Sequence, residues 1–587
     1  MVDFRRTHTC GALRESDAGK EVLLTGWVHR HRNFGSLVFI DLRDRFGITQ
    51  VILDPVTTKN AYEAGHKLRQ ESVIAVKGKV QLRKDPNPNI PTGKIEIIPT
   101  ELHVLSESDV LPISVSDDTV EVNDEMRLQY RYLDMRRGDI TKNLIQRHKA
   151  MMSVRRFLDS QGFIEVVTPI LGKSTPEGSR DYLVPSRVYP GAFYALPQSP
   201  QIFKQILMIG GLDRYFQMAT CFRDEDLRAD RQPEFCQIDM EMSFGSYEDL
   251  FPIVEKLMQT VFKECIDVEL PKTFRRMTYD ECMENYGCDK PDLRFDMKLC
   301  RLDDLAKEST FTIFHEILSH KGIVKGFTVK GGADISRKEI DELTTYVQSL
   351  GGKGLVWMKN QETGFSSSIS KFLSEEQQKA WISRLGLQVG DLAFVVAGGQ
   401  KKVNQVLDHL RRKVARQRNL IKPKSYEALW VTDFPLFAYN EEEKRLESEH
   451  HPFTSPHLED IRLFDTEPLK MRSSSYDLVL NGYELASGSQ RIHDNRLQEK
   501  IFQVLGLTKE ECVTKFGFFI EALKYGTPPH LGCALGFDRI MMILCGTESI
   551  RDVVAFPKTQ SAQDLMTKAP SQVHDMQLKE LKIQIKE

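Results

Sequence analysis

The chain has 587 residues, which is too many for one hydrophobic core, so we expect several domains. Hydrophobic residues make up 41% and charged residues 28%, an ordinary globular composition that excludes a disordered or collagen-like protein. The formal net charge is −3, so a nucleic-acid partner would have to be bound by local basic surfaces and not by overall basicity.

The cysteines and the apolar runs exclude two further classes. The ten cysteines include no C-x-x-C pair, which predicts reduced thiols and no zinc site of the finger type. No uncharged apolar run reaches the length of about 18 residues that spans a membrane, and residues 1–11 lack the apolar segment of a secretory signal. We expect a cytoplasmic protein with no membrane partner.

Short β-rich runs separated by turns occupy the N-terminal part of the chain. They cover 22–31, 36–42, 48–53, 72–82 and 94–105. The loop over 85–93 is dense in Pro, Asn and Gly and is expected to connect the last two strands. Short strands in this number and spacing predict an OB-fold barrel.

The rest of the chain predicts an α+β protein whose second domain is interrupted. The acidic segment 106–124 is typical of a hinge, and 143–161 has helical apolar spacing before an extended run over 163–171. Residues 295–424 have helix and strand signals of their own, so we interpret them as an insertion. The predicted organisation is an OB-fold domain (1–107), a hinge (108–140), a second domain in two segments (141–294 and 425–560), an inserted α+β domain (295–424) and a C-terminal extension (561–587).

A block of alternating charges over 221–241 contains Phe222-Arg-Asp-Glu225 and Pro233-Glu-Phe235. By itself such a block is typical of a solvated hairpin. Two other segments stand beside it: 153–169, which ends in Pro169, and Gly536-Phe-Asp-Arg539. Together the three resemble the motifs of the class II aminoacyl-tRNA synthetases. Residues 153–169 resemble motif 1, the charged block resembles motif 2, and Gly536-Phe-Asp-Arg539 resembles motif 3. The resemblance covers nearly the whole chain. It implies a catalytic domain built on an antiparallel sheet and a homodimer formed through motif 1.

The resemblance also implies which residues carry the ATP chemistry. Attack of a carboxylate on the α-phosphorus builds charge on phosphate oxygens, which fixed guanidinium groups and a metal ion stabilise. The implied catalytic residues are Arg223 and Arg539. Asp477 and Glu484 are the implied ligands of Mg²⁺. By their spacing alone, these two acids could equally be solvent-facing residues of a strand. The implied ATP-binding residues are Arg223, Glu225, Gln232, Phe235, Glu484, Gly536 and Arg539, with Phe235 stacked on adenine.

Three segments, 196–205, 449–453 and Ser489-Gln-Arg491, resemble the aspartyl branch of the family. Lys204 and Arg491 are implied to face the side-chain carboxylate of aspartate, and a neutral amide would leave these cations poorly paired. Glu177 lies in a loop, 174–181, that is implied to close over the amino acid, although a surface turn has the same composition. The implied aspartate-binding residues are Glu177, Ser199, Gln201, Lys204, Gln237, Asp239, His450 and Arg491.

The barrel is implied to read the anticodon, because single-stranded RNA is recognised by stacking on aromatic rings and by hydrogen bonds to base edges. The implied contacts are Arg32, Asn33, Phe34, Phe39 and Gln50. Without the resemblance these residues suit an ordinary strand pair. Asn33 and Phe34 stand where the family commonly has an acidic and a smaller apolar residue. Whether the protein discriminates strictly at the first anticodon base is therefore left open. Ala486-Ser487 is a second departure, where relatives commonly have glycines, and it predicts a slightly narrower pocket floor.

The implied function is ATP-dependent ligation of L-aspartate to tRNA(Asp) through aspartyl-adenylate, with ATP as a substrate and Mg²⁺ as the metal. The insertion marks the bacterial or organellar branch, and the N-terminus without a presequence favours the bacterial one. Two alternatives stay open: an enzyme that also aspartylates tRNA(Asn), and a synthetase-like RNA-binding protein without catalysis. The second would be expected to lack Arg223, Lys204, Arg491 or Arg539, and all of them are present.

Overall fold

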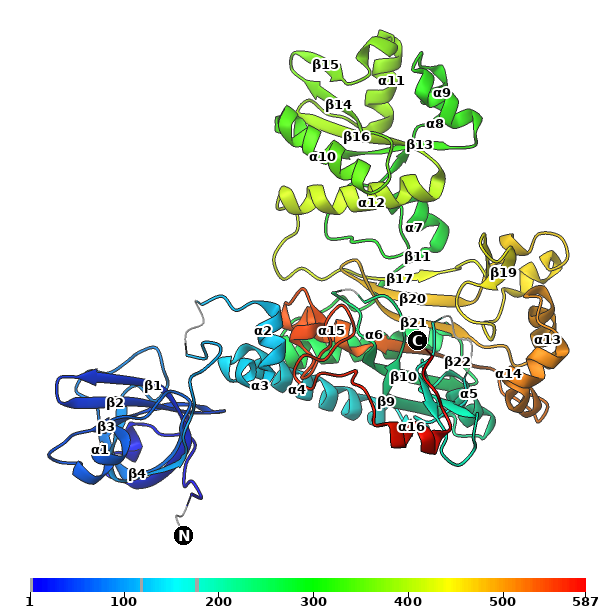
Figure 1. Cartoon of the computed structure of the whole chain (residues 1–587). Coiled ribbons are helices and arrows are strands. Elements are labelled where there is room, and N and C mark those ends of the chain that lie inside the picture. The colour runs from blue at the N-terminus through cyan, green and yellow to red at the C-terminus, as the bar shows by residue number, and fades with distance from the viewer. Residues whose placement is uncertain (1–3, 117–119, 175–178, 228, 587) are drawn as a thin grey trace. The chain divides into compact units, whose positions relative to one another are not determined.

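The computed structural model describes residues 4–116, 120–174, 179–227 and 229–586. Its contacts divide the chain into two compact units. The first contains the residues up to Lys142 together with Ala555–Thr559 and Gln563–Ser571. The second contains Asn143–Val554, Gln560–Ala562 and the residues from Gln572 onward. Figure 1 labels the elements of both.

The first unit is built around a small closed barrel with the strand order β1-β2-β3-β5-β4. The strands are β1 (Glu21–Phe34), β2 (Leu37–Asp44), β3 (Gly47–Leu53), β4 (Val73–Leu82) and β5 (Ile95–Ser106). Along β2, buried and partly exposed residues alternate, because successive side chains of a strand point to opposite faces. The predicted OB-fold barrel is confirmed, and helix α1 (Lys59–Gly65), which the sequence did not predict, lies between β3 and β4.

The segment predicted as a hinge has a folded structure. It contains α2 (Asp124–Gln129), α3 (Arg131–Asp134) and a 3-10 turn (Met135–Arg137). Ile113, Val115 and Leu133 pack into a small core. Arg131 and Asp134 are both buried and pair at 2.7 Å between Nη1 and Oδ2. The apolar residues of this core are few and widely spaced, so they leave little periodicity in the sequence.

An eight-stranded sheet with the order β11-β17-β20-β21-β22-β10-β9-β6 organises the second unit. Its strands are β6 (Ile164–Glu165), β9 (Arg214–Phe222), β10 (Glu234–Ser243), β11 (Arg275–Thr278), β17 (Ala428–Thr432), β20 (Ser475–Leu480), β21 (Tyr483–Gln490) and β22 (His530–Gly536). The pairings are antiparallel except for the edge pairs β11–β17 and β6–β9. Segments on both sides of the insertion supply neighbouring strands, which confirms the antiparallel core.

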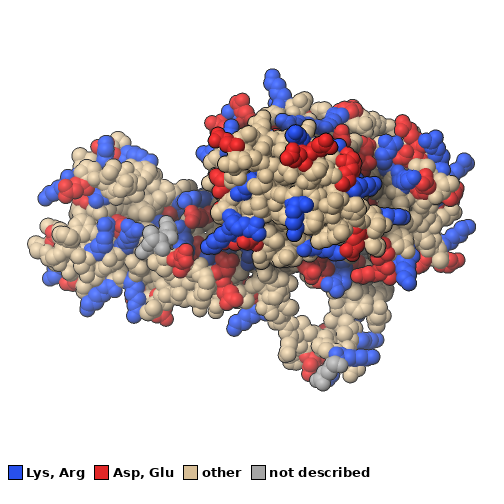
Figure 2. Space-filling model, turned by 90° about the horizontal axis from the view of Figure 1, so that it is seen from above, with Lys and Arg blue, Asp and Glu red and all other residues tan. Residues whose placement is uncertain are grey.

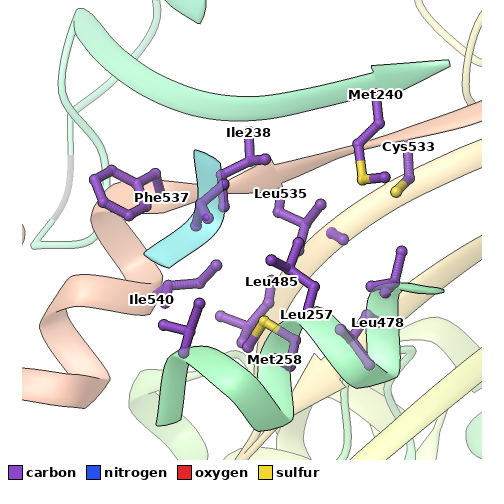
Figure 3. Close-up of a cluster of buried hydrophobic side chains, with 14 of the residues drawn as sticks. Ile238, Met240, Leu257, Met258, Leu478, Leu485, Cys533, Leu535, Phe537 and Ile540 are labelled. Atoms are coloured by element: carbon purple, nitrogen blue, oxygen red, sulfur yellow. The ribbon is translucent and has the colours of Figure 1, made fainter. Parts of the chain in front are cut away.

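Helices α4 (Asp139–Ser160), α6 (Tyr247–Ile266) and α15 (Phe537–Cys545) pack on this sheet and form the largest core. Figure 3 shows Leu257 and Met258 of α6 and Ile540 of α15 facing the strand residues Ile238 and Leu535. The helix predicted over 143–161 corresponds to most of α4. Of the extended run predicted over 163–171, only β6 is a regular strand.

The inserted domain has a separate five-stranded sheet with the order β12-β13-β16-β14-β15. Its elements are β12 (Cys300–Arg301), α8 (Asp303–Glu308), α9 (Thr312–Ser319), β13 (Ile323–Val329), α10 (Arg337–Ser349), β14 (Val356–Gln361), β15 (Gly364–Ser367), α11 (Glu375–Leu385), β16 (Asp391–Gly398) and α12 (Gln400–Gln417). Phe327 and Phe394 contribute to one core, whereas Val324 and Val395 contribute to another. The sheet is therefore covered on both faces.

Shorter elements complete the second unit: β7 (Leu183–Pro185), β8 (Phe193–Ala195), α5 (Gln201–Ile209), α7 (Tyr279–Tyr286), β18 (Phe437–Asn440), β19 (Arg445–Ser448), α13 (Asn495–Val504), α14 (Lys509–Ala522) and α16 (Asp575–Leu581). None of the ten cysteines, all of which lie in the described residues, forms a disulfide. Basic and acidic side chains are interspersed over the face in Figure 2, in line with the small net charge. Among the described helices, none has the length and apolar character to cross a membrane.

Candidate active site and barrel surface

A cavity of about 370 Å³ lies over the eight-stranded sheet. The predicted site residues that line it are Ser199, Gln201, Lys204, Arg223, Glu225, Gln232, Phe235, Gln237, Asp239, His450, Glu484, Arg491, Gly536 and Arg539. Asp477 is buried beside His450 and does not reach the cavity wall. Glu177 lies outside the described residues.

Four buried charged side chains close one part of the cavity. Lys204 of α5 places Nζ 2.7 Å from Oδ2 of Asp239 and 3.5 Å from Oε2 of Glu241. Arg491 donates from Nε to Oε1 of Glu241 at 2.9 Å and from Nη2 to Oε2 at 3.1 Å. Each of the four is at most 2% exposed. Their charges cancel, which is the condition for keeping ionised groups in a low-dielectric interior.

The remaining donors of Arg491 are also engaged. Nη1 donates to Nε2 of His451 at 2.8 Å and to Oγ of Ser489 at 2.5 Å, and Nη2 donates to the Gly532 carbonyl at 3.3 Å. An arginine only donates, so Nε2 of His451 is the acceptor in this contact, and the Phe453 amide lies 3.2 Å from the other ring nitrogen, Nδ1. Burial, with Arg491 beside it, lowers the pKa of His451 well below its ordinary value, which agrees with a neutral ring. A carboxylate in the cavity could replace these two neutral acceptors on Nη1.

The pairing decides how the two acids respond to burial. Burial raises the pKa of Asp239, and Lys204 offsets only part of this rise. Burial acts on Glu241 in the same sense, but Arg491 and Lys204 outweigh it and hold the pKa of Glu241 below its ordinary value. Glu241 therefore stays ionised and fixes the orientation of Arg491.

A second part of the cavity combines an aromatic ring with two arginines. The Arg223 guanidinium lies 5.1 Å from the centre of the Phe235 ring. Arg539 donates from Nη1 to the Glu484 carbonyl at 2.8 Å. The nearest atom to a Cβ built on Gly536 would be 3.7 Å away, so packing does not require a glycine there and its missing side chain leaves room. Such a wall suits a stacked purine with its phosphates.

Asp477 and Glu484 lie on the paired strands β20 and β21. Oδ1 of Asp477 is buried and accepts no hydrogen bond within the described residues, and Ser487 lies directly across from Asp477. Burial, with Glu484 nearby, raises the pKa of Asp477. A carboxylate oxygen without a hydrogen bond, a second acid and a hydroxyl are the hard oxygen donors that Mg²⁺ takes, so the residues fit this ion. In the described ranges, no group of three or more His, Cys, Asp or Glu side chains is arranged to hold a metal ion, so phosphate oxygens and water would complete the coordination.

His450 connects this pair of acids to the cavity. Its Nε2 lies 3.7 Å from Oδ1 of Asp477, and its Nδ1 lies 3.3 Å from Oγ of Ser475. Burial disfavours the charged ring, but Asp477 and Glu449 outweigh burial and raise the pKa of His450 above its ordinary value.

On the barrel, Arg32, Phe39 and Gln50 share the outer face. Arg32 lies across from Phe39, and Gln50 lies across from Asp41, two residues along the same strand as Phe39. Arg32 pairs with Asp41 at 2.7 Å between Nη2 and Oδ1. Asn33 and Phe34 stand apart at the end of β1, where Phe34 is 80% exposed.

Sequence reasoning missed Glu96 on this face. Its Oε2 accepts a hydrogen bond from Nε2 of Gln50 at 2.9 Å, and burial raises its pKa. The available signal was an acid between Ile95 and Ile97, two core residues of β5. This acid places an acceptor beside Gln50, and both side chains are buried, at 5% and 4% exposed.

Two family models match the chain. Residues 22–105 match the OB-fold nucleic acid binding domain, and residues 123–560 match the tRNA synthetases class II (D, K and N). The second match covers more than half of the chain. The chain belongs to the class II tRNA synthetases.

Curated relatives of this synthetase match over the full length. A protein of Protochlamydia amoebophila (strain UWE25), named aspartate–tRNA(Asp/Asn) ligase, is 62% identical, with 100% of this chain and 98% of the relative covered. A protein of the same name from Chlamydia muridarum is 58% identical, with 99% and 100% covered.

Solved structures share the fold of this synthetase. The asparaginyl-tRNA synthetase of Pyrococcus horikoshii complexed with asparaginyl-adenylate aligns with a TM-score of 0.60 at 18% identity, covering 95% of this chain and 99% of that one. A putative aspartyl-tRNA synthetase of Leishmania major Friedlin aligns with the same TM-score and identity and covers 95% and 94%. At this identity the likeness supports the fold alone.

Three residues of the synthetase site were also missed. Glu241 holds Arg491, Ser487 stands beside Asp477, and Oδ2 of Asp538 accepts a hydrogen bond from the Cys236 amide at 2.9 Å. Glu241 and Asp538 lie within the quoted motifs, so their sequence position was a signal, but nothing in the sequence indicated their partners. Ser487 was noted only as a departure from glycine.

Proposed function

We propose that this synthetase is an aspartate–tRNA(Asp/Asn) ligase, which activates L-aspartate with ATP and transfers it to tRNA(Asp) and tRNA(Asn). The observation that carries the proposal is the buried pair of cations, Lys204 and Arg491, in the wall of a cavity that also presents Arg223 and Phe235. The name of the full-length relatives supports the same activity.

Selection of aspartate follows from the donors in the cavity wall. Its side-chain carboxylate accepts from Nζ of Lys204 and from Nη1 of Arg491, where it displaces His451 and Ser489. Asparagine presents an NH₂ group, itself a donor, to these donors, so the charge-assisted hydrogen bonds that a carboxylate accepts are lost at a buried site, which costs several kcal/mol. Selection against asparagine then needs no editing step.

Other lining residues hold the backbone of the amino acid. Asp239, Gln201 and Gln237 supply acceptor oxygens for the α-ammonium group, and Ser199 and His450 complete the wall. These groups orient the α-carboxylate toward the nucleotide, so that orientation supplies much of the rate.

In the first step an oxygen of the α-carboxylate attacks the α-phosphorus, and pyrophosphate leaves. Arg223 stabilises the charge that develops on the phosphate oxygens. Arg539 adds a second guanidinium for this charge, Phe235 provides a stacking surface for the adenine, and Glu225 and Gln232 line the same cavity. When bound by Asp477 and Glu484, Mg²⁺ supplies positive charge to the triphosphate.

In the second step a hydroxyl of the terminal ribose of the tRNA attacks the aspartyl carbonyl, and AMP leaves. On the barrel, a base stacks on Phe39 and a base edge meets Arg32. Gln50 and Glu96 are hydrogen-bonded to each other and at most 5% exposed, so only their remaining polar atoms serve base edges. Asn33 and Phe34 lie at the tip of the β1–β2 hairpin. There they discriminate less between first anticodon bases than the buried cations discriminate between amino acids.

The test is aminoacylation with labelled aspartate of purified tRNA(Asp) and tRNA(Asn), side by side. We expect both to be charged. Charging of tRNA(Asp) alone would restrict the function to a discriminating enzyme, and charging of neither would overturn the catalytic proposal in favour of an RNA-binding protein.

We also propose a homodimer formed by the edge of the sheet at β6. Exposed apolar side chains occur on β6 and in the segments that follow it, at Ile164, Val167, Leu171, Tyr189 and Phe193, of which Val167 is 78% exposed. An unpaired edge strand with exposed apolar side chains favours association with a second copy. Sedimentation of Val167→Asp beside the wild-type chain tests this, and a wild-type monomer at micromolar concentration would contradict it.

A further inference from the structure

The segment that leads from the catalytic sheet into the insertion, residues 288–297, lies against the acids of the nucleotide site. Nζ of Lys290 is 3.7 Å from Oε2 of Glu484 and 3.9 Å from Oδ1 of Asp289. Both side chains of the Lys290–Glu484 pair are partly exposed at 43% and 34%, so a ligand can reach them. Lys290 was not among the predicted site residues.

Helix α12 of the inserted domain holds this segment at Lys290 and at two residues that follow it. Arg412 donates from Nη2 to the Lys290 carbonyl at 3.1 Å and from Nε to Oδ1 of Asp408 at 3.0 Å. The fully buried Arg411 donates from Nη2 to the Asp292 carbonyl at 3.4 Å and from Nε to the Met297 carbonyl at 2.8 Å. Two consecutive arginines of one helix thus fix the backbone that carries Lys290.

The same segment packs on the turn between β20 and β21, the strands that carry Asp477 and Glu484. Gly482 in this turn has φ +81°. A Cβ built on it would lie 3.2 Å from Cβ of Asp292 and 3.6 Å from Nη1 of Arg412. The inserted domain therefore contacts both the turn that joins the acid-bearing strands and the cation that faces Glu484.

We propose that Lys290 is a positioning residue for the nucleotide site, which orients the Glu484 carboxylate and is itself held by Arg412 of the inserted domain. The proposal rests on the proposed ATP chemistry. It gives the inserted domain a role in nucleotide binding. An exposed ion pair contributes little to stability. Its effect is therefore expected in nucleotide binding and not in folding.

The test uses the full-length chain with Lys290→Met, Lys290→Arg and Lys298→Met, the last being an exposed lysine of the following residues that serves as the matched control. In aspartate-dependent ATP–pyrophosphate exchange, Lys290→Met is expected to raise the KM for ATP·Mg²⁺ by about fivefold, while the KM for aspartate stays unchanged. Lys290→Arg is expected to restore most of the loss, and Lys298→Met to behave as the wild type. Calorimetric titration of ATP·Mg²⁺ should show the same weakening of binding.

A double-mutant cycle separates this role from a general structural one. If Arg412 acts through Lys290, the combined Arg412→Met and Lys290→Met changes raise the KM for ATP·Mg²⁺ by less than the product of the single effects. An unchanged KM and Kd for ATP·Mg²⁺ in Lys290→Met would overturn the proposal, as would an equal rise in the KM for aspartate. Absence of exchange in the wild-type chain would instead refute the proposed function.

Discussion

The amino-acid end of the cavity and the outer face of the barrel solve recognition in opposite ways. In the cavity, Lys204 and Arg491 are at most 2% exposed and are paired with acids of the chain before any ligand arrives. On the barrel, the Arg32–Asp41 pair is exposed on the Arg32 side, and Phe34 is 80% exposed. Burial makes a mismatched ligand expensive, whereas an exposed surface allows water to replace a lost contact.

Under the proposed function, this contrast would make the enzyme strict for the amino acid and tolerant of two tRNAs. A wrong amino acid places a donor group against buried donors, while a wrong base at Asn33 or Phe34 faces solvent. The following predictions test the two halves of the contrast, from the largest expected effect to the smallest.

Lys204→Met should lower kcat/KM for aspartate in ATP–pyrophosphate exchange by a factor of about 10²–10³, because it leaves Asp239 without its buried partner. Binding of tRNA, measured by filter retention, should change little. Retained exchange at ordinary aspartate concentrations would remove Lys204 from the substrate site and break the contrast.

Glu484→Gln should raise the Mg²⁺ concentration needed for half-maximal exchange by about 10–100-fold, since one anionic oxygen donor is lost. The control is Glu362→Gln, an exposed acid in the turn between β14 and β15. An unshifted Mg²⁺ titration in Glu484→Gln would contradict the assignment of this acid as a metal ligand.

Phe39→Ala should lower kcat/KM for tRNA in aminoacylation by an amount equivalent to about 1–3 kcal/mol, the free energy of one lost base stack. Exchange without tRNA should be unaffected, and Phe46→Ala, at an exposed phenylalanine in the β2–β3 turn, should leave both activities near the wild-type values. Equal loss of exchange and charging in Phe39→Ala would mean that the ring supports folding and not RNA binding.

Glu96→Gln should slightly stabilise the barrel at neutral pH. Burial raises the pKa of Glu96 in the folded chain, so the ionised carboxylate costs stability above that pKa, and this cost disappears as the pH falls below the ordinary value of 4.5. The glutamine can still accept the hydrogen bond of Gln50. Amide hydrogen exchange of the barrel strands at neutral and acid pH measures this, and an equal difference at both pH values would argue against titration of Glu96.

The sequence was sufficient for the elements with strong periodicity and for the residues within quoted motifs. The number and spacing of the short β-rich runs predicted the barrel, and the helical spacing over 143–161 predicted α4. The motif residues, from Ser199 to Arg539, are brought together in one cavity although they come from distant parts of the chain.

What the sequence did not indicate were the partners of these residues. Glu241 and Arg491 are 250 positions apart and meet only because β10 and β21 both pair with β22. The folded hinge was missed because its core is small, and Lys290 was missed because its contact with Glu484 depends on how the insertion anchors its segment. Burial and charge pairing are tertiary properties, so no local pattern contains them.

The most direct test of the account is ATP–pyrophosphate exchange with aspartate and with asparagine at matched concentrations. The buried cations predict a ratio of kcat/KM values in favour of aspartate of about 10⁴ or more, as for sites that leave a buried polar group unpaired by the wrong ligand. Comparable exchange with both amino acids would contradict the proposed role of Lys204 and Arg491.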